Sequence, residues 1–329
     1  MKKQKYSAFI VPTGIGAKIG GFAGDSGRFA AKISKIFPLI VNPNVVNAAC
    51  FSAINEKMLY VEGFTLTEFF KDNISLKLSE NNKIGVIFDK AISQDVLNIH
   101  INTINAVKTV YGIDVIGYEI CSEFADVNFF TTENGLSSGR INNPDTLVDA
   151  GKKLLDKGAD VLAVVCKFDE AEEDNYSDGE GVDVIGGAEA LISHYLSKIL
   201  KVPVVHAPAF DDYQIKPDLV HPKAAAEFIT PTFLPCLLLG LQNAPLIADG
   251  HDDNFVTIDD IEYLIMPFDS LGSSIVTNAI NKGIKILAIE NNKTVLNANS
   301  SNLGLNDVII KLKSYDDCLE YMKKALNEK

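Results

Sequence analysis

The chain has no tryptophan and only two arginines, Arg28 and Arg140, among its 329 residues. Lysine therefore supplies almost all of the positive charge, and the excess of acidic residues gives a formal net charge of −13. Such a chain would repel the phosphate backbone of a nucleic acid outside a local basic patch. We expect a small-molecule partner and no nucleic acid.

Long apolar runs are also missing. The longest candidate, residues 233–241, has about half of the roughly eighteen residues that a membrane span needs. The basic start, residues 1–5, leads into a strand-like and glycine-rich segment, not into the apolar core of a secretory leader. We therefore expect a cytoplasmic protein with no membrane partner.

The five cysteines are widely spaced and include no Cys-x-x-Cys pair. This pattern indicates neither a disulfide framework nor a zinc site. Free cysteine packs as a small hydrophobic residue, so most of these thiols are expected in the core.

Strand-like apolar runs alternate with helix-length amphipathic segments, which is typical of an α/β fold. We predict Rossmann-like, parallel or mostly parallel sheets with helices on both faces, arranged in two lobes. The predicted strands are Ala8–Val11, Leu39–Val41, Leu59–Glu62, Ile84–Phe88, Val115–Glu119, Val161–Val165, Val204–His206, Leu246–Ala248, Leu264–Met266 and Ile284–Ile289. The clearest predicted helices are Gln94–Val110, Asp145–Lys157 and Ala188–Leu200.

A domain boundary is predicted near residue 140, after Ser137-Ser138-Gly139-Arg140. It would separate an N-terminal lobe, residues 1–140, from a C-terminal lobe, residues 141–329. One intertwined domain is the alternative. The acidic stretch 169–181 is the best candidate for an exposed, mobile loop.

A glycine-rich segment follows the first strand and holds six glycines in the fourteen residues Gly14–Gly27. Glycine loses more chain entropy than other residues when it is fixed, so this loop predicts a close backbone approach by a ligand or by packing neighbours. Its spacing fits neither the dinucleotide fingerprint nor the Walker loop. The candidate ligand-binding residues here are Thr13, Gly14, Gly16, Gly20, Gly21 and Asp25.

Polar residues come at or just after many of the predicted strands. Ligands of open α/β sheets bind beyond the carboxyl ends of the strands, so these residues are candidates for contact with a substrate. They include Asn42, Glu62, Asp269 and Glu290.

Two histidines lie near carboxylates at strand ends, His206 before Asp211 and Asp212, and His251 after Asp249. An imidazole in this setting suits a general base. The two histidines and Asp249 are also a candidate set for a divalent metal, although no His-x-His or His-Glu-x-x-His spacing is present. No motif for an organic cofactor is found.

Two further segments are candidates for binding an anion. The turn 267–274 has Asp269, Ser270 and Ser273 at a predicted helix start, where free N–H groups favour negative charge. Ser138 and Arg140 lie in the second segment, and the guanidinium of Arg140 can bind a carboxylate or phosphate through two hydrogen bonds. Helix capping alone is the alternative for the turn.

Cys166 ends the strongest predicted strand and is a candidate nucleophile or proton carrier. The preceding helix, Gly158-Ala159-Asp160 and the buried strand resemble a segment of the aspartate/glutamate racemase superfamily. That resemblance implies proton transfer by two cysteines. The corresponding earlier strand, Leu39–Val41, ends without a cysteine. The reaction that stays compatible with this resemblance is therefore isomerisation or decarboxylation of a small dicarboxylate by one cysteine.

Nearly the whole chain resembles an uncharacterised domain-of-unknown-function family, DUF3326, of bacteria, cyanobacteria and plant plastids. The resemblance is carried by Val11–Ala17 with Gly20–Asp25, by Asn42–Ala49, by Tyr60–Gly63 and by Ala288–Leu296. It implies one fold along the chain and an enzymatic role, and it supplies no reaction.

These observations favour an enzyme that acts on a small anionic metabolite, as an isomerase or lyase without an organic cofactor. Cys166 with His206 or His251 would move the proton. The alternatives are a transferase that holds a phosphorylated substrate or nucleotide at the glycine-rich loop, and a ligand-binding regulatory protein without turnover. The apolar run 232–241 is a candidate contact in a homo-oligomer.

Overall fold

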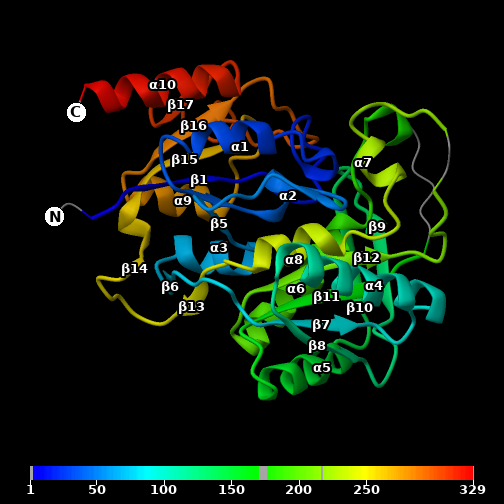
Figure 1. The fold of residues 1–329 in the computed structure, drawn as a ribbon. Coiled ribbons are helices and arrows are strands. Elements are labelled where there is room, and N and C mark those ends of the chain that lie inside the picture. The colour runs from blue at the N-terminus through cyan, green and yellow to red at the C-terminus, as the bar shows by residue number, and fades with distance from the viewer. Residues whose placement is uncertain (1–2, 170–175, 216–217, 329) are drawn as a thin grey trace.

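We analysed a computed structural model that describes residues 3–169, 176–215 and 218–328. The fold contains two separate parallel sheets with helices packed between and around them (Figure 1). This arrangement confirms the predicted Rossmann-like α/β class. Among the described helices, none is both long and apolar enough to cross a lipid bilayer.

The larger sheet has six strands, all parallel, in the order β17-β16-β15-β1-β2-β5. Their bounds are β1 Tyr6–Phe9, β2 Leu39–Val41, β5 Met58–Tyr60, β15 Ile261–Pro267, β16 Lys285–Ile289 and β17 Ile309–Leu312. Numbered along the chain and read from β5, the order is 3-2-1-4-5-6, which is that of the doubly wound dinucleotide-binding fold. The order reverses at β1, so the loop that follows β1 lies where such folds bind ligands.

Helices cover both faces of the larger sheet. One face packs against α1 (Gly27–Ile33) and α10 (Tyr315–Asn327), and the other packs against α3 (Gly63–Phe70) and α9 (Ser274–Asn281) (Figure 1). Alternate residues of each strand supply the two cores; in β1, Phe9 joins the first and Ala8 the second. Burial on both faces explains why these strands read as continuous apolar runs.

The smaller sheet has four parallel strands in the order β12-β11-β7-β8. Their bounds are β7 Ile84–Phe88, β8 Val115–Ile120, β11 Val161–Lys167 and β12 Val204–Ala209. One face packs against α4 (Gln94–Tyr111) and α8 (Leu234–Leu241), and the other packs against α5 (Asp145–Asp156) and α6 (Gly186–Leu200). The first of these cores is continuous with that of the larger sheet.

Shorter elements complete the described chain. The strands are β3 Asn47–Ala48, β4 Phe51–Ser52, β6 Ser75–Lys77, β9 Val127–Thr131, β10 Ser137–Ile141, β13 Leu246–Ala248 and β14 Phe255–Val256. The helices are α2 Pro43–Val46, α7 Ala225–Phe228 and the 3-10 turns η1 Gly21–Ala23, η2 Tyr176–Asp178 and η3 Ile258–Asp260.

The boundary predicted near residue 140 does not separate the two sheets. Residues 137–141 form β10, which pairs with β9 in a hairpin, and both parallel sheets contain strands from each side of residue 140. The larger sheet is built from residues 6–60 and 261–312, and the smaller sheet from residues 84–209. The chain therefore leaves the larger sheet, completes the smaller one and returns. Part of the predicted acidic loop, residues 170–175, lies outside the described residues.

The apolar run 232–241 packs inside the molecule. It forms most of α8, and Leu234, Leu238 and Leu241 are fully buried against the smaller sheet and α4. These side chains cannot also form a contact between subunits, so this segment does not provide the expected oligomer interface. The five cysteines are free, and four are buried, as predicted.

Candidate functional site

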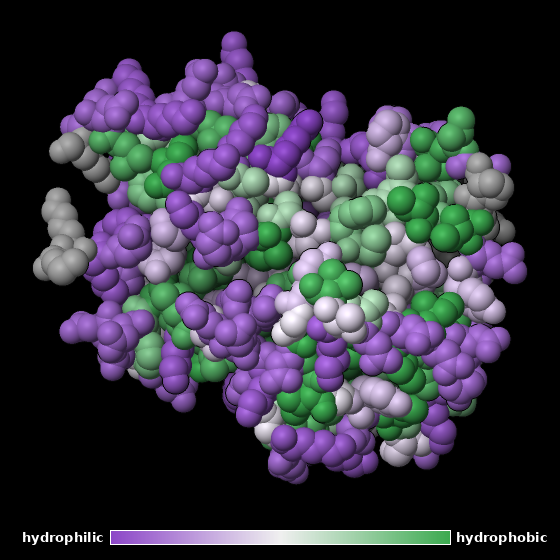
Figure 2. Space-filling view, viewed as in Figure 1, coloured by the Kyte–Doolittle hydropathy of each residue, from purple (hydrophilic) through white to green (hydrophobic). Residues whose placement is uncertain are grey.

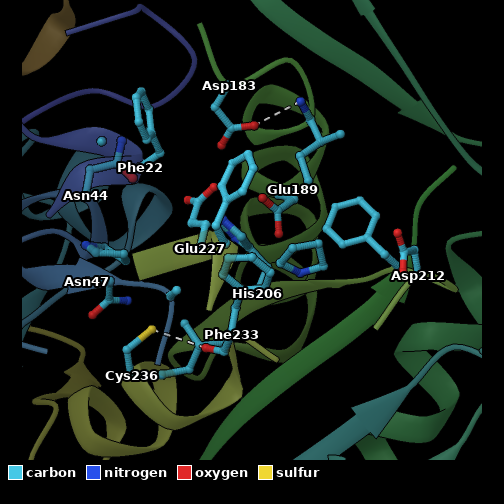
Figure 3. Close-up of a pocket in the computed structure, with 18 residues that line it drawn as sticks. Phe22, Asn44, Asn47, Asp183, Glu189, His206, Asp212, Glu227, Phe233 and Cys236 are labelled. Carbon is cyan, nitrogen blue, oxygen red and sulfur yellow. Dashed lines mark hydrogen bonds between the residues drawn. The ribbon is translucent and has the colours of Figure 1, made fainter. Parts of the chain in front are cut away.

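A cavity of about 370 Å³ lies where the two sheets meet (Figure 3). This volume suits a small organic molecule. Its walls come from the loops after β1 and β2, from β12, from α7 and α8, and from the start of α6. The lining residues are Gly21, Phe22, Pro43, Asn44, Asn47, Ala49, Asp183, Ile185, Glu189, His206, Pro208, Phe210, Asp212, Glu227, Phe228, Phe233, Cys236 and Leu237.

The glycine-rich loop borders the cavity, but several of its N–H groups are bound within the protein. Asp25 Oδ1 accepts from the N–H of Gly20 at 2.7 Å, and Asn292 Oδ1 accepts from the N–H of Ile19 at 2.8 Å. Gly24 has a φ of +59°, and a Cβ there would stand 2.6 Å from the carbonyl oxygen of Asn47. The loop therefore needs glycine for its own packing, and these two N–H groups are not free for an anion.

A small annex of about 30 Å³ lies under the loop and adjoins the main cavity. Its volume is close to that of one water molecule. Five predicted site residues line it, namely Thr13, Gly14, Gly16, Gly20 and Gly21. Gly21 also lines the main cavity, as do the annex residues Phe22, Asn44 and Asp183. The loop thus lies beside the cavity without enclosing a large ligand.

The N-terminus of α6 points its first N–H groups at a carboxylate of the protein itself. Asp183 Oδ1 accepts from the N–H of Ile185 at 3.1 Å (Figure 3) and from the N–H of Gly186 at 3.0 Å. Ser137 Oγ accepts from the N–H of Gly187 at 2.8 Å. Burial raises the pKa of Asp183, while these two N–H groups lower it. The positive end of the helix is therefore already neutralised by Asp183, which leaves little attraction for an anionic ligand.

Glu189 lies one turn further along α6 and points into the cavity (Figure 3). Its side chain is only 6% exposed, and Oε1 has no hydrogen-bond partner within the described residues. Burial raises the pKa of Glu189 well above its ordinary value, and the charges of Asp183 and Glu227 raise it further. The carboxyl group thus holds its proton more tightly than an exposed glutamate does, beside two other carboxyl groups, a condition that is typical of functional sites.

His206 projects from β12 into the same cavity and contacts the side of α6. Its Nδ1 lies 2.7 Å from Ser193 Oγ, which is 3.2 Å from the carbonyl oxygen of Ala190. Burial lowers the pKa of His206 to about 4, so the imidazole is neutral at pH 7. If the Ser193 hydroxyl donates its hydrogen bond to the Ala190 carbonyl, it can only accept from His206. The imidazole then carries its proton on Nδ1, and Nε2 is free to act as a base.

Aromatic rings form much of the remaining wall. Phe22, Phe210, Phe228 and Phe233 line the cavity, and among the described lining residues none is lysine or arginine. Lys223 lies near the rim, where its Nζ is 5.8 Å from the centre of the Phe22 ring and donates to the carbonyl of Lys18. A cavity of carboxyl groups and aromatic faces favours a cationic ligand with an apolar part.

Cys166 lies in the core and does not line the cavity. It is 1% exposed on the face of β11 that packs against α5 and α6, and burial raises its pKa well above the ordinary thiol value, with Asp89 adding to the shift. Reactive cysteines need a lowered pKa and access to a substrate, and Cys166 has neither. His206 is therefore the one predicted proton carrier that the structure brings to the cavity.

His251 and Asp249 lie on the surface, away from His206. Both are exposed, and His251 Nε2 is 3.8 Å from Asp72 Oδ1. Neither lines the cavity, so the three residues proposed together as metal ligands do not converge. Within the part of the chain that the structure describes, no group of three or more His, Cys, Asp and Glu side chains is arranged to hold a metal ion.

The polar residues predicted at the ends of β2 and β5 stabilise the fold. Asn42 bridges β1 and β2, because its amide accepts from the N–H of Val11 at 3.0 Å and donates to the Val11 carbonyl at 2.7 Å. Glu62 caps α3 by accepting from the N–H groups of Phe64 and Thr65, and burial raises its pKa to about 7. Neither residue lines the cavity.

The two predicted anion-binding segments also lie outside the cavity. Asp269 is buried and accepts from the N–H of Thr294 at 3.0 Å, and Ser270 and Ser273 flank the turn before α9. Arg140 is exposed and Ser138 partly exposed on β10. Glu290 follows β16 and is not among the lining residues. Of the predicted site residues, Gly21 and His206 thus line the main cavity, and Thr13, Gly14, Gly16 and Gly20 line the adjoining annex. The other candidates line neither.

The sequence-based prediction missed Asp183, Glu189 and Glu227. A signal for Glu189 was present, because it shares one helical face with Ile192, Ser193 and Leu196, which are all buried. A glutamate in an otherwise buried stripe calls for an explanation. Asp183 lies next to an acidic stretch and resembles a solvated loop residue in the sequence.

Fold and cavity together define a doubly wound α/β protein with a cavity between two parallel sheets. The family model described as "Protein of unknown function (DUF3326)" matches residues 6–327. The chain is 33% identical over 307 residues to an uncharacterised lipoprotein of Synechococcus sp., and the match covers 91% of this chain and 85% of the relative. The protein belongs to this DUF3326 family, as the sequence predicted.

No solved structure matches the chain. The family and its cyanobacterial relative carry no assigned activity, and neither match supports the local resemblance to racemases.

Proposed function

We propose that the protein is an enzyme that acts on a small organic molecule with a protonated amino group. The observation that carries this proposal is the buried, unpartnered Oε1 of Glu189 in the cavity wall. An ammonium group would donate the missing hydrogen bond, and its positive charge would favour the ionised form of the carboxyl group. Burial then strengthens the ion pair, because the surrounding medium screens it weakly.

In this proposal Glu189 holds the ammonium group and His206 moves a proton. The neutral Nε2 of His206 accepts a proton from a carbon of the substrate and returns it to the same or another atom of that molecule. The reaction class is therefore isomerisation or elimination without an organic cofactor. The aromatic side chains Phe22, Phe210 and Phe233 would exclude water from the apolar part of the substrate.

An anionic substrate is the second candidate. The annex bordered by Gly14 and Gly16 favours it, because it places main-chain groups of the glycine-rich loop beside the cavity. A protonated Glu189 would then donate a hydrogen bond to the anion. The two candidates predict opposite changes in the protonation of Glu189, which would release a proton when an amine binds and hold or take up a proton when an anion binds.

Titration calorimetry in two buffers of different ionisation enthalpy separates these candidates, with benzylamine and benzoate as matched probes. A bound amine makes Glu189 release its proton, so the observed enthalpy depends on the buffer. Glu189→Gln abolishes the release and weakens benzylamine binding about ten- to hundredfold, the loss expected for a charged hydrogen bond. Glu320 is exposed, so Glu320→Gln is the control; it is expected to leave the proton release and the affinity for benzylamine unchanged.

Binding of benzoate with proton uptake, and no binding of benzylamine, would reverse the assigned polarity of the site. For the catalytic part, the protein is incubated in D2O with phenylglycinamide, whose carbon beside the amino group carries an exchangeable proton. Wild type and the exposed-site variant His251→Gln are expected to incorporate one deuterium, and His206→Gln is expected to incorporate none. Exchange that survives His206→Gln rules out this residue as the base.

A further inference from the structure

A second cavity of about 200 Å³ adjoins the first. It shares six lining residues with the main cavity, namely Pro208, Phe210, Asp212, Glu227, Phe228 and Phe233. Its far wall is formed by Tyr213, Gln214, Ile215, Thr230 and Pro231. The two volumes together are within the range of sites that enclose drug-sized ligands.

Three phenylalanine rings and two carboxyl groups, Asp212 and Glu227, line the region that the two cavities share. Phe210 and Phe233 meet edge to face, with ring centres 6.4 Å apart, and both rings line both cavities. Hydrophobic side chains also gather on the surface around α7, which carries Phe228 (Figure 2). Apolar groups in the second cavity are these rings with Pro208, Pro231 and Ile215, and its two carboxyl groups, Asp212 and Glu227, are shared with the main cavity.

We propose that the substrate is an elongated amine whose alkyl or aryl tail occupies the second cavity. Its ammonium group would lie at Glu189, and its apolar part would pass Phe210 and Phe233 toward Ile215. This inference rests on the proposed function, because it places the cationic end of the same molecule in the main cavity. It narrows the substrate class from any small amine to amines with a hydrophobic tail.

The test measures the affinity of the full chain for linear alkylamines from ethylamine to octylamine by calorimetry and ligand-detected NMR. A tail whose methylenes are buried in the second cavity gains up to about fourfold in affinity for each added methylene until the cavity is filled. Ile215→Ala is expected to weaken octylamine at least threefold and to leave ethylamine unchanged. Ile215 is 61% exposed, so its truncation spares the fold.

Leu219→Ala is the matched control, because Leu219 is a fully exposed aliphatic residue that lines neither cavity. It is expected to leave the whole series unchanged. Binding of every amine with proton release but with equal affinity would overturn the elongated substrate and retain the proposed function. Absence of binding by all amines would overturn both. Equal losses for Ile215→Ala and Leu219→Ala would show a surface effect and exclude the second cavity.

Discussion

Replacement of Glu189 by glutamine tests the electrostatic state of the cavity without any ligand. Glutamine keeps the shape of the side chain and cannot ionise. Glu189 is 6% exposed, lacks a partner at Oε1 and lies near the charges of Asp183 and Glu227. The native protein therefore holds a proton on Glu189 more tightly than the unfolded chain does.

The sign of the effect follows from this raised pKa. Below pH 4.5, the ordinary value for glutamate, both states are protonated and the full stability of the acid form is present. As pH rises above that value, the unfolded chain releases the proton first, and the free energy of unfolding falls by up to about 1.4 kcal/mol per pH unit. The loss ends when pH passes the folded-state pKa. Between pH 5 and 7 the wild type loses at most about 3 kcal/mol through this residue.

The assay is urea denaturation followed by far-ultraviolet circular dichroism, since the chain lacks tryptophan. Stability is measured at pH 4.5, 6 and 7.5 for wild type, Glu189→Gln and the control Glu320→Gln. The difference between Glu189→Gln and wild type is expected to be smallest at pH 4.5 and to shift in favour of the variant as pH rises. The control is expected to follow the wild type at every pH.

A difference that stays constant with pH, or that shifts against the variant, would refute this reasoning. It would mean that the native protein does not hold a proton on Glu189 more tightly than the unfolded chain does. The unpartnered acid at the centre of the proposed amine site would then not exist.

Three further predictions concern the cavity and its surroundings. The wild type is expected to lose stability as pH falls from 6.5 to 4, because the lowered pKa of His206 makes the unfolded chain take up a proton first. In His206→Gln this loss is expected to be smaller, by at most about 3 kcal/mol in the free energy of unfolding, as measured by urea denaturation. Gly187→Ala is expected to destabilise the protein by at least about 2 kcal/mol, because its Cβ would stand 2.1 Å from a carbonyl oxygen of β10. Gly63→Ala is the control; its Cβ would meet nothing within 4 Å, so thermal stability should change little. Cys166 is expected to resist iodoacetamide until the protein unfolds, while the partly exposed Cys50 reacts first in peptide mapping; equal labelling of the two in the native state would contradict the buried placement.

Local sequence patterns predicted the elements of the fold well. Leu39–Val41, Ile84–Phe88 and Leu246–Ala248 have the predicted bounds, and α4 and α6 differ from the predicted helices by one or two residues at one end. Alternation and helical periodicity depend on neighbours a few residues apart, so the sequence carries them directly. The glycine-rich loop follows the first strand directly, so its place in the chain was predictable for the same reason; that it borders a cavity is shown by the structure.

Contacts between distant residues were not predictable in this way. The pairing of β1 with β15 joins residues about 250 positions apart, and it places both ends of the chain in one sheet. Local propensity contains no term for such a pairing, so the predicted boundary at residue 140 followed composition alone. Strand order, in turn, decided which polar strand ends reached the cavity and which, such as Asn42 and Asp269, were used in the fold.

The sequence by itself determined the α/β class, most strand and helix bounds, the absence of disulfide motifs and the membership in the DUF3326 family. The tertiary structure decided which groups line the cavity. It buried Glu189 beside Asp183 and Glu227, used N–H groups of the glycine-rich loop and of α6 internally, and placed Cys166 in the core. The physical reason is that a carboxyl group acquires its pKa and its ligand preference from burial and neighbouring charges, which only the folded chain brings together.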